Sequence, residues 1–194
     1  EVLTLQQVNQ PVPKDNEVLI KVHAVSINDW DWGLLRGKPF INRMMAGIIK
    51  PSKNKILGSD IAGTIVAIGS KVSLFKPGDE VFGDLSAAGF GGFAEYVSIP
   101  DQNVYELPET LNIKEAPIAE PTAVALHAVE LGERELSKTL KKSKALIIGG
   151  GAIGLLSGLI LSKVKHCKEI IIVDLNEKRL GECSKYLDAE AVKP

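Results

Sequence analysis

Three features are scarce or missing in this chain, and each absence excludes a class of protein. The only cysteines are Cys167 and Cys183, with no C-x-x-C spacing, so neither a disulfide framework nor a structural zinc site is expected. No apolar run reaches the roughly 18 residues of a membrane-spanning helix, and residues 1–30 carry no signal-peptide pattern. The net charge is only -1, without the basic cluster that nucleic-acid binding requires. We therefore expect a cytoplasmic protein with no membrane or nucleic-acid partner.

The first hundred residues have the sequence pattern of a β domain. Short alternating or β-branched runs are separated by glycine, proline and aspartate rather than by helical segments. This is typical of an antiparallel β structure, and the spacing of the runs suits a small barrel. Residues 34–55 break the pattern with an irregular, basic stretch that we interpret as a solvated surface loop. The predicted strands cover residues 18–25, 61–68, 80–82, 93–99 and 104–107.

After Pro108 the apolar residues take helical spacing, which indicates a change of domain. We predict a helix over residues 121–131, because Pro121 suits the first helical position. The domain boundary is placed between Pro117 and Glu120, so that residues 1–119 form one domain and residues 120–194 the next.

The most informative stretch lies in the second domain. Apolar residues 145–148 lead into the glycine-rich run 149–154, a long apolar segment at 155–161 and a β-branched run at 170–173 that ends at Asp174. This order predicts a strand, a glycine turn, a helix and a second strand. It is a βαβ unit with the dinucleotide fingerprint G-x-G-x-x-G. A helix over residues 177–187 and a third strand starting near Ala191 are predicted to follow.

Each position of the fingerprint has a physical reason. A glycine permits the tight turn, a second lets the backbone approach a pyrophosphate, and a third lets the helix pack closely on the strands. The free N–H groups of the helix start face the phosphates. Asp174 lies about 20 residues further on, where a carboxylate binds the adenosine ribose and repels a 2′-phosphate, so NAD(H) is predicted rather than NADP(H). The predicted pyrophosphate-binding residues are Gly149, Gly151, Ala152, Ile153 and Gly154.

Together these patterns resemble the medium-chain dehydrogenase/reductase superfamily over essentially the whole chain. The segments that carry the resemblance are residues 25–31, 58–63, 75–81, 91–96, 120–128, 149–154 and 173–179. The resemblance implies a GroES-like β barrel with the substrate site at residues 1–119. It also implies that residues 120–194 form the first part of a Rossmann doubly wound parallel sheet, in which Arg179 flanks the adenosine side.

At the residues that would perform the chemistry, the chain resembles the zinc-dependent branch of the superfamily less than the zinc-independent branch. Zinc alcohol and polyol dehydrogenases carry a cysteine where Asn28 stands, and a His-Glu pair where Ser59 and Asp60 stand. Because amide and hydroxyl groups are poor zinc ligands, no catalytic zinc is expected. If zinc were bound, its ligands would be Asp60 and Glu120, since the polyol-type branch places a further glutamate at the latter position.

The zinc-independent, quinone-reductase-like branch fits residues 26–31 and 58–63 better. Its enzymes pass hydride between nicotinamide and a polarised C=C or C=O bond without a metal. By this resemblance Asn28 is the candidate catalytic residue, an amide donor that stabilises the substrate carbonyl. The alternative is a turn asparagine that bonds its own backbone.

For the remaining side chains of interest we expect structural roles. Trp30, Trp32 and Phe40 are predicted to pack in the core rather than line a pocket. Asp31 is expected to be structural. His127 is predicted to be a buried helix histidine, and no histidine is assigned a catalytic role.

A complete dinucleotide domain has two βαβαβ halves, and this chain supplies most of the first. We interpret the sequence as a fragment of a longer enzyme or a truncated relative. The leading interpretation is an NAD(H)-dependent, homo-oligomeric oxidoreductase that acts on a small alcohol, carbonyl or quinone-like molecule. The alternatives are a zinc-dependent alcohol or polyol dehydrogenase and a non-catalytic dinucleotide-binding or scaffolding relative.

Overall fold

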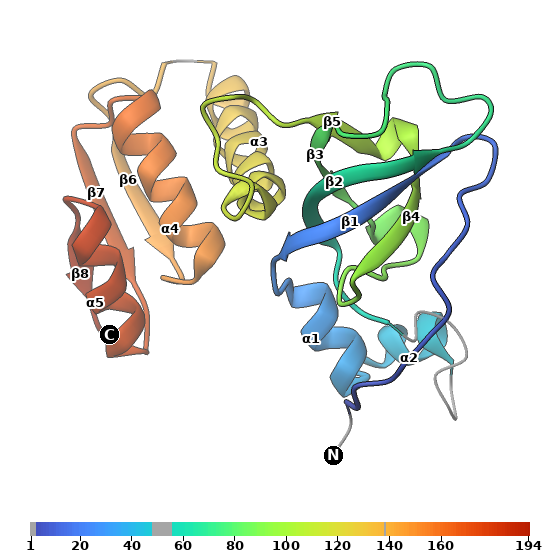
Figure 1. Ribbon diagram of the computed structural model, residues 1–194. Coiled ribbons are helices and arrows are strands. Elements are labelled where there is room, and N and C mark those ends of the chain that lie inside the picture. The colour runs from blue at the N-terminus through green and yellow to red at the C-terminus, as the bar shows by residue number, and fades with distance from the viewer. Residues whose placement is uncertain (1–2, 48–55, 138) are drawn as a thin grey trace. The chain divides into compact units, whose positions relative to one another are not determined.

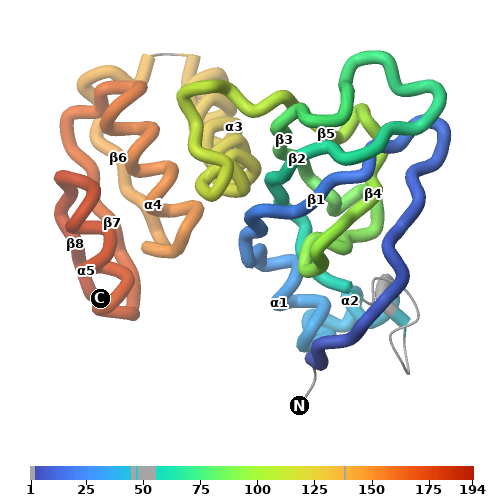
Figure 2. The backbone as a smooth tube through the Cα atoms, viewed as in Figure 1, coloured from blue at the N-terminus to red at the C-terminus, as the bar shows by residue number. Residues whose placement is uncertain are grey.

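The computed structural model describes residues 3–47, 56–137 and 139–194. The chain divides into two units, Glu1–Ile118 and Ala119–Pro194, which can be followed in Figure 1 and, as a smooth backbone trace, in Figure 2. Each unit has its own sheet and its own hydrophobic core. No helix within these ranges is long and apolar enough to cross a membrane.

The first unit is built on a five-stranded antiparallel sheet of order β4-β1-β2-β3-β5. Its strands lie close to the predicted runs, and the core beneath them includes Val18, Ile20 and Ile65. The strand predicted from residue 93 starts later, because Phe93 donates its backbone hydrogen bond to Leu57 instead of joining the ladder. The strands are β1 (Glu17–Val25), β2 (Asp60–Ile68), β3 (Glu80–Asp84), β4 (Tyr96–Pro100) and β5 (Val104–Glu106).

Two helices occupy part of the stretch for which the sequence predicts a loop. Helix α1 (Asp29–Arg36) and helix α2 (Phe40–Ala46) follow β1, so the loop prediction for residues 34–55 is wrong at residues 34–36 and 40–46. The rest of that prediction, residues 48–55, lies outside the described residues. The basic composition of this stretch indicates a solvated surface, whereas the helix signals lie at the two ends of α1.

Those signals are a capping box and a terminal glycine. The Asn28 side chain accepts a hydrogen bond from the backbone of Trp30, and the Asp31 carboxylate accepts one from the backbone of Asn28. This exchange satisfies backbone donors that a helix start leaves without partners. Gly37 then ends the helix with φ of 59°, a left-handed conformation that favours glycine.

The second unit holds a three-stranded parallel sheet of order β6-β7-β8. The predicted strands at 145–148 and 170–173 are parallel neighbours, with Ile147 opposite Ile172. The helices bury apolar side chains against this sheet, in a core that includes Val129, Ile160 and Leu180. The elements are α3 (Ala119–Glu135), β6 (Lys144–Ile148), α4 (Ala152–Leu159), a π-helical turn (Ile160–Val164), β7 (Glu169–Val173), α5 (Glu177–Tyr186) and β8 (Glu190–Val192).

Candidate dinucleotide and substrate sites

The turn between β6 and α4 requires glycine at two positions. Gly149 has φ of +107°, and its N–H donates to the carbonyl of Val173 at 2.7 Å, which ties the turn to β7. A Cβ at position 154 would overlap the carbonyl oxygen of Gly149, so the first turn of α4 folds directly against the glycine turn. Because these positions have no side chain, the backbone of the first turn of α4 lies close to the backbone of the glycine turn.

The start of α4 has backbone groups that no side chain covers. Gly151 is its N-cap and provides no side-chain cap, while a Cβ built on Gly151 would meet nothing within 4 Å. The N–H groups of a first helical turn have no acceptors within the helix, and the helix dipole is positive at this end. Ala152 and Ile153 belong to that first turn. This geometry fits a pyrophosphate that approaches the backbone from outside.

Asp174 fixes the glycine turn from the neighbouring strand. Its side chain is 8% exposed, and its Oδ2 accepts a hydrogen bond of 2.8 Å from the backbone of Gly150. Its Oδ1 accepts one of 2.7 Å from the backbone of Asn176, and Arg179 Nη1 lies 3.7 Å from Oδ2. The bonds from Asn176 and Gly150, helped by Arg179, lower the pKa of Asp174 below its ordinary value. The carboxylate is therefore charged at neutral pH and faces the turn.

Two residues of this arrangement were not singled out from the sequence. Gly150 supplies the N–H that reaches Asp174, and Asn176 caps α5 by accepting from the backbones of Lys178 and Arg179. The D-x-N spacing after a strand is a helix-start signal that points to Asn176. A shallow depression of about 550 Å³ adjoins this point, lined by Leu175, Asn176, Glu177, Lys178 and Lys193.

A second polar cluster lies in the first unit, where β1 and β2 run antiparallel. Asp60, at the start of β2, is only 1% exposed. Its Oδ2 accepts from the hydroxyl of Ser26 and, at 3.1 Å, from the side-chain amide of Asn28. Its Oδ1 accepts from the hydroxyl of Ser59 at 2.9 Å. The structure thus brings Asn28, Ser59 and Asp60 together with Ser26, and all four lie in the segments that carry the family resemblance.

Asp31 has the structural role that the sequence predicts. Its buried carboxylate accepts from the backbone of Asn28 at 2.9 Å and from the backbone of Gly58 at 2.7 Å. It therefore ties the turn at residue 28 to the turn before β2. The buried Asp31 carboxylate thus holds the turns on both sides of the polar cluster.

Comparison with known proteins identifies the family. Residues 14–109 match the model of the alcohol dehydrogenase GroES-like domain. An uncharacterized zinc-type alcohol dehydrogenase-like protein of Escherichia coli is 34% identical over 197 residues, covering 88% of this chain and 54% of that protein. Human quinone oxidoreductase is 38% identical over 159 residues, covering 80% of this chain and 44% of the relative. The chain belongs to the medium-chain dehydrogenase/reductase superfamily.

Solved structures agree with this membership. Quinone oxidoreductase from Coxiella burnetii matches with a TM-score of 0.79 and 26% identity, over 98% of this chain and 57% of that one. A Sinorhizobium meliloti structure bound to NADP matches with a TM-score of 0.76 and 28% identity, over 96% and 57% of the two chains. The predicted fold class, a GroES-like domain followed by the first part of a Rossmann sheet, is confirmed. The chain spans about half the length of the curated relatives that it matches.

The side chains at the zinc-ligand positions of this superfamily do not fit a zinc ion. The Asn28 amide nitrogen faces a carboxylate and acts as a donor, so it offers no lone pair to a metal. Both oxygens of Asp60 already accept hydrogen bonds. Glu120 lies in the first turn of α3, in the second unit. In the part of the chain that the structure describes, no three His, Cys, Asp or Glu side chains are grouped to hold a metal.

Several aromatic and histidine predictions are corrected by the structure. Trp30, Trp32 and Phe40 are 46%, 53% and 63% exposed, so the prediction of core packing is wrong. Short helices at the surface bury one side only. The Trp32 ring instead makes a cation–π contact with Arg36, whose Cζ lies 5.0 Å from the ring centroid. His127 is exposed on α3 rather than buried.

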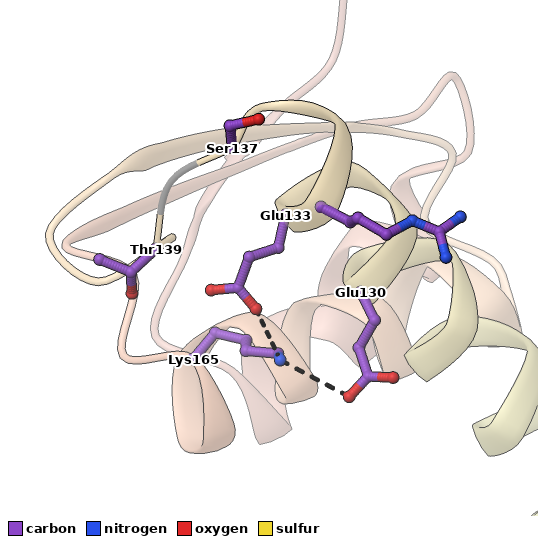
Figure 3. A pocket seen from close by; sticks show the side chains of 6 residues that line it. Glu130, Glu133, Ser137, Thr139 and Lys165 are labelled. Atoms are coloured by element: carbon purple, nitrogen blue, oxygen red, sulfur yellow. Dashed lines mark hydrogen bonds and ion pairs between the residues drawn. The ribbon is translucent and has the colours of Figure 1, made fainter.

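A polar depression at the end of α3 is a different kind of site. Figure 3 shows Glu130 and Glu133 pointing toward Lys165, whose Nζ lies 3.6 Å and 2.8 Å from their carboxylates. These charges are satisfied by one another. Lys165 follows the π-helical turn, so the depression lies at the opposite end of the α4 segment from the glycine turn. We interpret it as a structural ion-pair cluster.

Proposed function

We propose that this protein is an NAD(H)-dependent oxidoreductase that transfers hydride between nicotinamide and a small alcohol, carbonyl or quinone-like substrate, without a catalytic zinc. The observation that carries the proposal is the glycine turn held beside a shielded, charged Asp174. This pairs an anion-binding backbone with a carboxylate about where an adenosine ribose would lie. Membership in a dehydrogenase/reductase superfamily supports the reaction class.

The residues have separate tasks in this proposal. The backbone from Gly149 to Gly154 binds the pyrophosphate, Asp174 accepts from the ribose hydroxyls, and Arg179 flanks the adenosine side. When bound, the nicotinamide supplies or accepts the hydride. The amide of Asn28 donates to the substrate oxygen, and this bond strengthens as the oxygen gains negative charge during carbonyl reduction.

The first prediction concerns cofactor choice. We expect NADH to bind about tenfold or more tightly than NADPH, because the Asp174 carboxylate accepts from a free ribose and repels a phosphate there. Asp174→Ser should reduce the difference between the affinities for NADH and NADPH. Asp188→Ser, which removes an exposed carboxylate after α5, should leave that difference unchanged. Calorimetric titration of each variant with both cofactors measures the gap, and circular dichroism checks the fold.

Equal affinity of the unmodified protein for NADH and NADPH would refute the assignment of Asp174. The non-catalytic alternative is separated by a second measurement on the same samples. If the protein binds NADH but does not oxidise it when any carbonyl or quinone acceptor is added, the non-catalytic alternative is correct.

A further inference from the structure

Gly150 is the position of the glycine turn whose backbone is held by two side chains. Its N–H donates to Asp174 Oδ2 at 2.8 Å, and its carbonyl oxygen accepts from the thiol of Cys183, with the sulfur 3.6 Å away. A Cβ built on Gly150 would lie 3.4 Å from the same sulfur. The N–H is therefore held from the end of β7, and the carbonyl is held from α5, which carries Cys183.

Cys183 meets the conditions for a hydrogen-bond donor at this place. It is 2% exposed, within the apolar core of the second unit. Burial, followed by the negative charge of Asp174, raises the pKa of its thiol, so the sulfur keeps its hydrogen at neutral pH. Gly150 is buried as well, and the described contacts give its carbonyl no other donor. A buried carbonyl without a donor is costly, so even a weak S–H···O bond stabilises this arrangement.

The two bonds to Gly150 act on different peptide groups. The bond to Asp174 orients the peptide between Gly149 and Gly150, whereas the Gly150 carbonyl belongs to the next peptide. Glycine permits wide rotation between two successive peptides, so the bond to Asp174 alone does not fix the second one. The thiol of Cys183 supplies that separate restraint.

The orientation of the second peptide decides where the Gly151 N–H points. The peptide is trans, so its carbonyl and its N–H point in opposite directions. Because the carbonyl faces the buried thiol, the Gly151 N–H faces away from it. The described contacts give this N–H no acceptor, whereas the Gly151 carbonyl accepts from the backbone of Leu155 at 2.9 Å. A Cβ built on Gly151 would meet nothing within 4 Å, so the space beside this residue is open.

We propose that Cys183 is a positioning residue for the cofactor, whose thiol turns the Gly151 N–H toward the pyrophosphate of NAD(H). This rests on the proposed function, in which the glycine turn binds that pyrophosphate. An N–H that already has this direction donates to a phosphate oxygen without first reorienting. In this role Cys183 acts through the backbone and does not contact the cofactor.

Paired substitutions separate the loss of the hydrogen bond from the loss of the sulfur. Cys183→Ser and Cys183→Ala both shrink the side chain, but only serine keeps a hydrogen to donate. The matched control is Cys167, a half-buried cysteine whose thiol donates to the carbonyl of Leu140 at 3.3 Å. Cys167 follows the π-helical turn, at the other end of the α4 segment from the glycine turn. Cys167→Ser and Cys167→Ala therefore report the general effect of changing a thiol–carbonyl bond in this unit.

The first readout is the backbone amide signal of Gly151 in a ¹H–¹⁵N spectrum of the protein without cofactor. We expect Cys183→Ala to shift and broaden this signal, because the second peptide is then free to rotate. Cys183→Ser should leave it closer to its position in the unmodified protein, and neither change at Cys167 should move it. A Gly151 signal that is the same in Cys183→Ala and Cys183→Ser overturns the proposal.

The second readout compares the binding of ADP, which carries a diphosphate, with that of adenosine, which does not. Cys183→Ala should weaken ADP binding about threefold and leave adenosine binding unchanged, since the lost restraint acts only on the phosphates. Cys183→Ser should recover most of the ADP affinity. Titrations followed by the amide spectra measure both affinities. Equal weakening for ADP and adenosine shows a merely structural role and overturns the proposal.

Thermal unfolding checks that each variant is folded. If Cys183→Ala does not fold, Cys183→Val takes its place, because valine keeps the apolar volume but has no hydrogen to donate. Failure of the unmodified protein to bind NADH contradicts the proposed function. A protein that binds NADH, but whose Gly151 signal is indifferent to the loss of the donor at position 183, contradicts only the role of Cys183.

Discussion

Glycine positions in the second unit differ in what they tolerate. At Gly154 a Cβ would overlap backbone, the carbonyl oxygen of Gly149, and backbone cannot move aside as a flexible side chain can. At Gly158 the obstacle is the side chain of Leu187, which packs across α4. Gly181, in α5, has nothing within 4 Å of an added Cβ. The chemical change from glycine to alanine is the same at each site, but its consequence is set by the neighbours.

This contrast gives a matched pair of variants. Gly154→Ala should lower the free energy of unfolding by about 2 kcal/mol or more and weaken NADH binding, because the overlap pushes α4 away from the glycine turn. Gly181→Ala should raise it by about 0.5–1 kcal/mol, since alanine favours the helix. Urea denaturation and NADH titration measure both effects. Similar stabilities for the two variants would contradict the close packing at Gly154.

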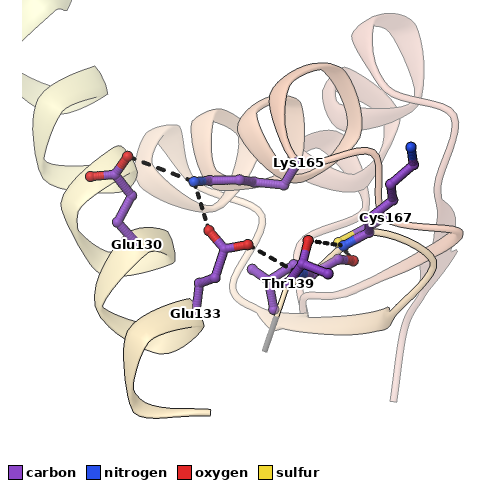
Figure 4. Close-up of polar contacts among 7 residues, drawn as sticks. Glu130, Glu133, Thr139, Lys165 and Cys167 are labelled. Atoms are coloured by element: carbon purple, nitrogen blue, oxygen red, sulfur yellow. Dashed lines mark hydrogen bonds and ion pairs between the residues drawn. The ribbon is translucent and has the colours of Figure 1, made fainter. Parts of the chain in front are cut away.

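Among the elements, α3 and the end of the α4 segment are joined by the Lys165 cluster, seen from another side in Figure 4. Lys165 is 17% exposed and bonds Glu133 at 2.8 Å, while the second oxygen of Glu133 accepts from the Leu140 backbone at 3.0 Å. The Lys165 ammonium, followed by the Leu140 backbone, lowers the pKa of Glu133. The pairing with Glu133 raises the pKa of Lys165. The cluster ties α3 both to Leu140 in the segment before β6 and to the end of the α4 segment.

The signs of these two pKa shifts predict a pH dependence. The folded-state pKa of Glu133 lies below its ordinary 4.5, so its contribution to stability is present above that pH and is lost as pH falls through the lowered pKa. That of Lys165 lies above 10.5, so its contribution is lost only as pH rises past the raised value. Glu133→Gln should therefore lower the unfolding temperature by a constant amount from about pH 5 to pH 10.

Below about pH 4.5 the difference between Glu133→Gln and the unmodified protein should shrink, because protonation removes the same charge. The control is Glu182→Gln, which breaks an exposed pair with Lys185 on α5 and should have a smaller effect. Thermal unfolding across this pH range is the measurement. A difference that grows as pH falls would contradict the ion-pair role of Glu133.

At the scale of the whole molecule, one face of the parallel sheet stays exposed in the described structure. Ala145 and Ile147 of β6 pack toward the core, whereas Leu146 and Ile148 on the opposite face are 62% and 84% exposed. Strand β6 pairs only with β7 among the described strands, so its other edge carries backbone groups without ladder partners. Parallel sheets are normally covered on both faces, and exposed edges and apolar faces promote association.

We therefore expect the 194-residue protein to form oligomers or aggregates, measured by light scattering across a concentration series. Leu146→Lys should reduce association by placing a charge on the apolar face, with little loss of stability because the site is exposed. Hydrogen exchange should show weak protection along β6. A monodisperse monomer with protected amides throughout residues 145–173 would show that this face needs no partner.

The sequence by itself determined the βαβ unit, the family and the glycine turn, because these depend on local runs and on the conformations that glycine permits. Asp174 was also predictable, since its distance from the glycine turn is set by one helix and one strand. The tertiary structure alone decided the contacts of Asp60. Pairing of β1 with β2 brings Val25 opposite Ile61, and so places Ser26 and Asn28 against a carboxylate more than thirty residues away. It also decided that Trp30, Trp32 and Phe40 lie at the surface, because burial depends on what the rest of the chain packs against each side of a helix.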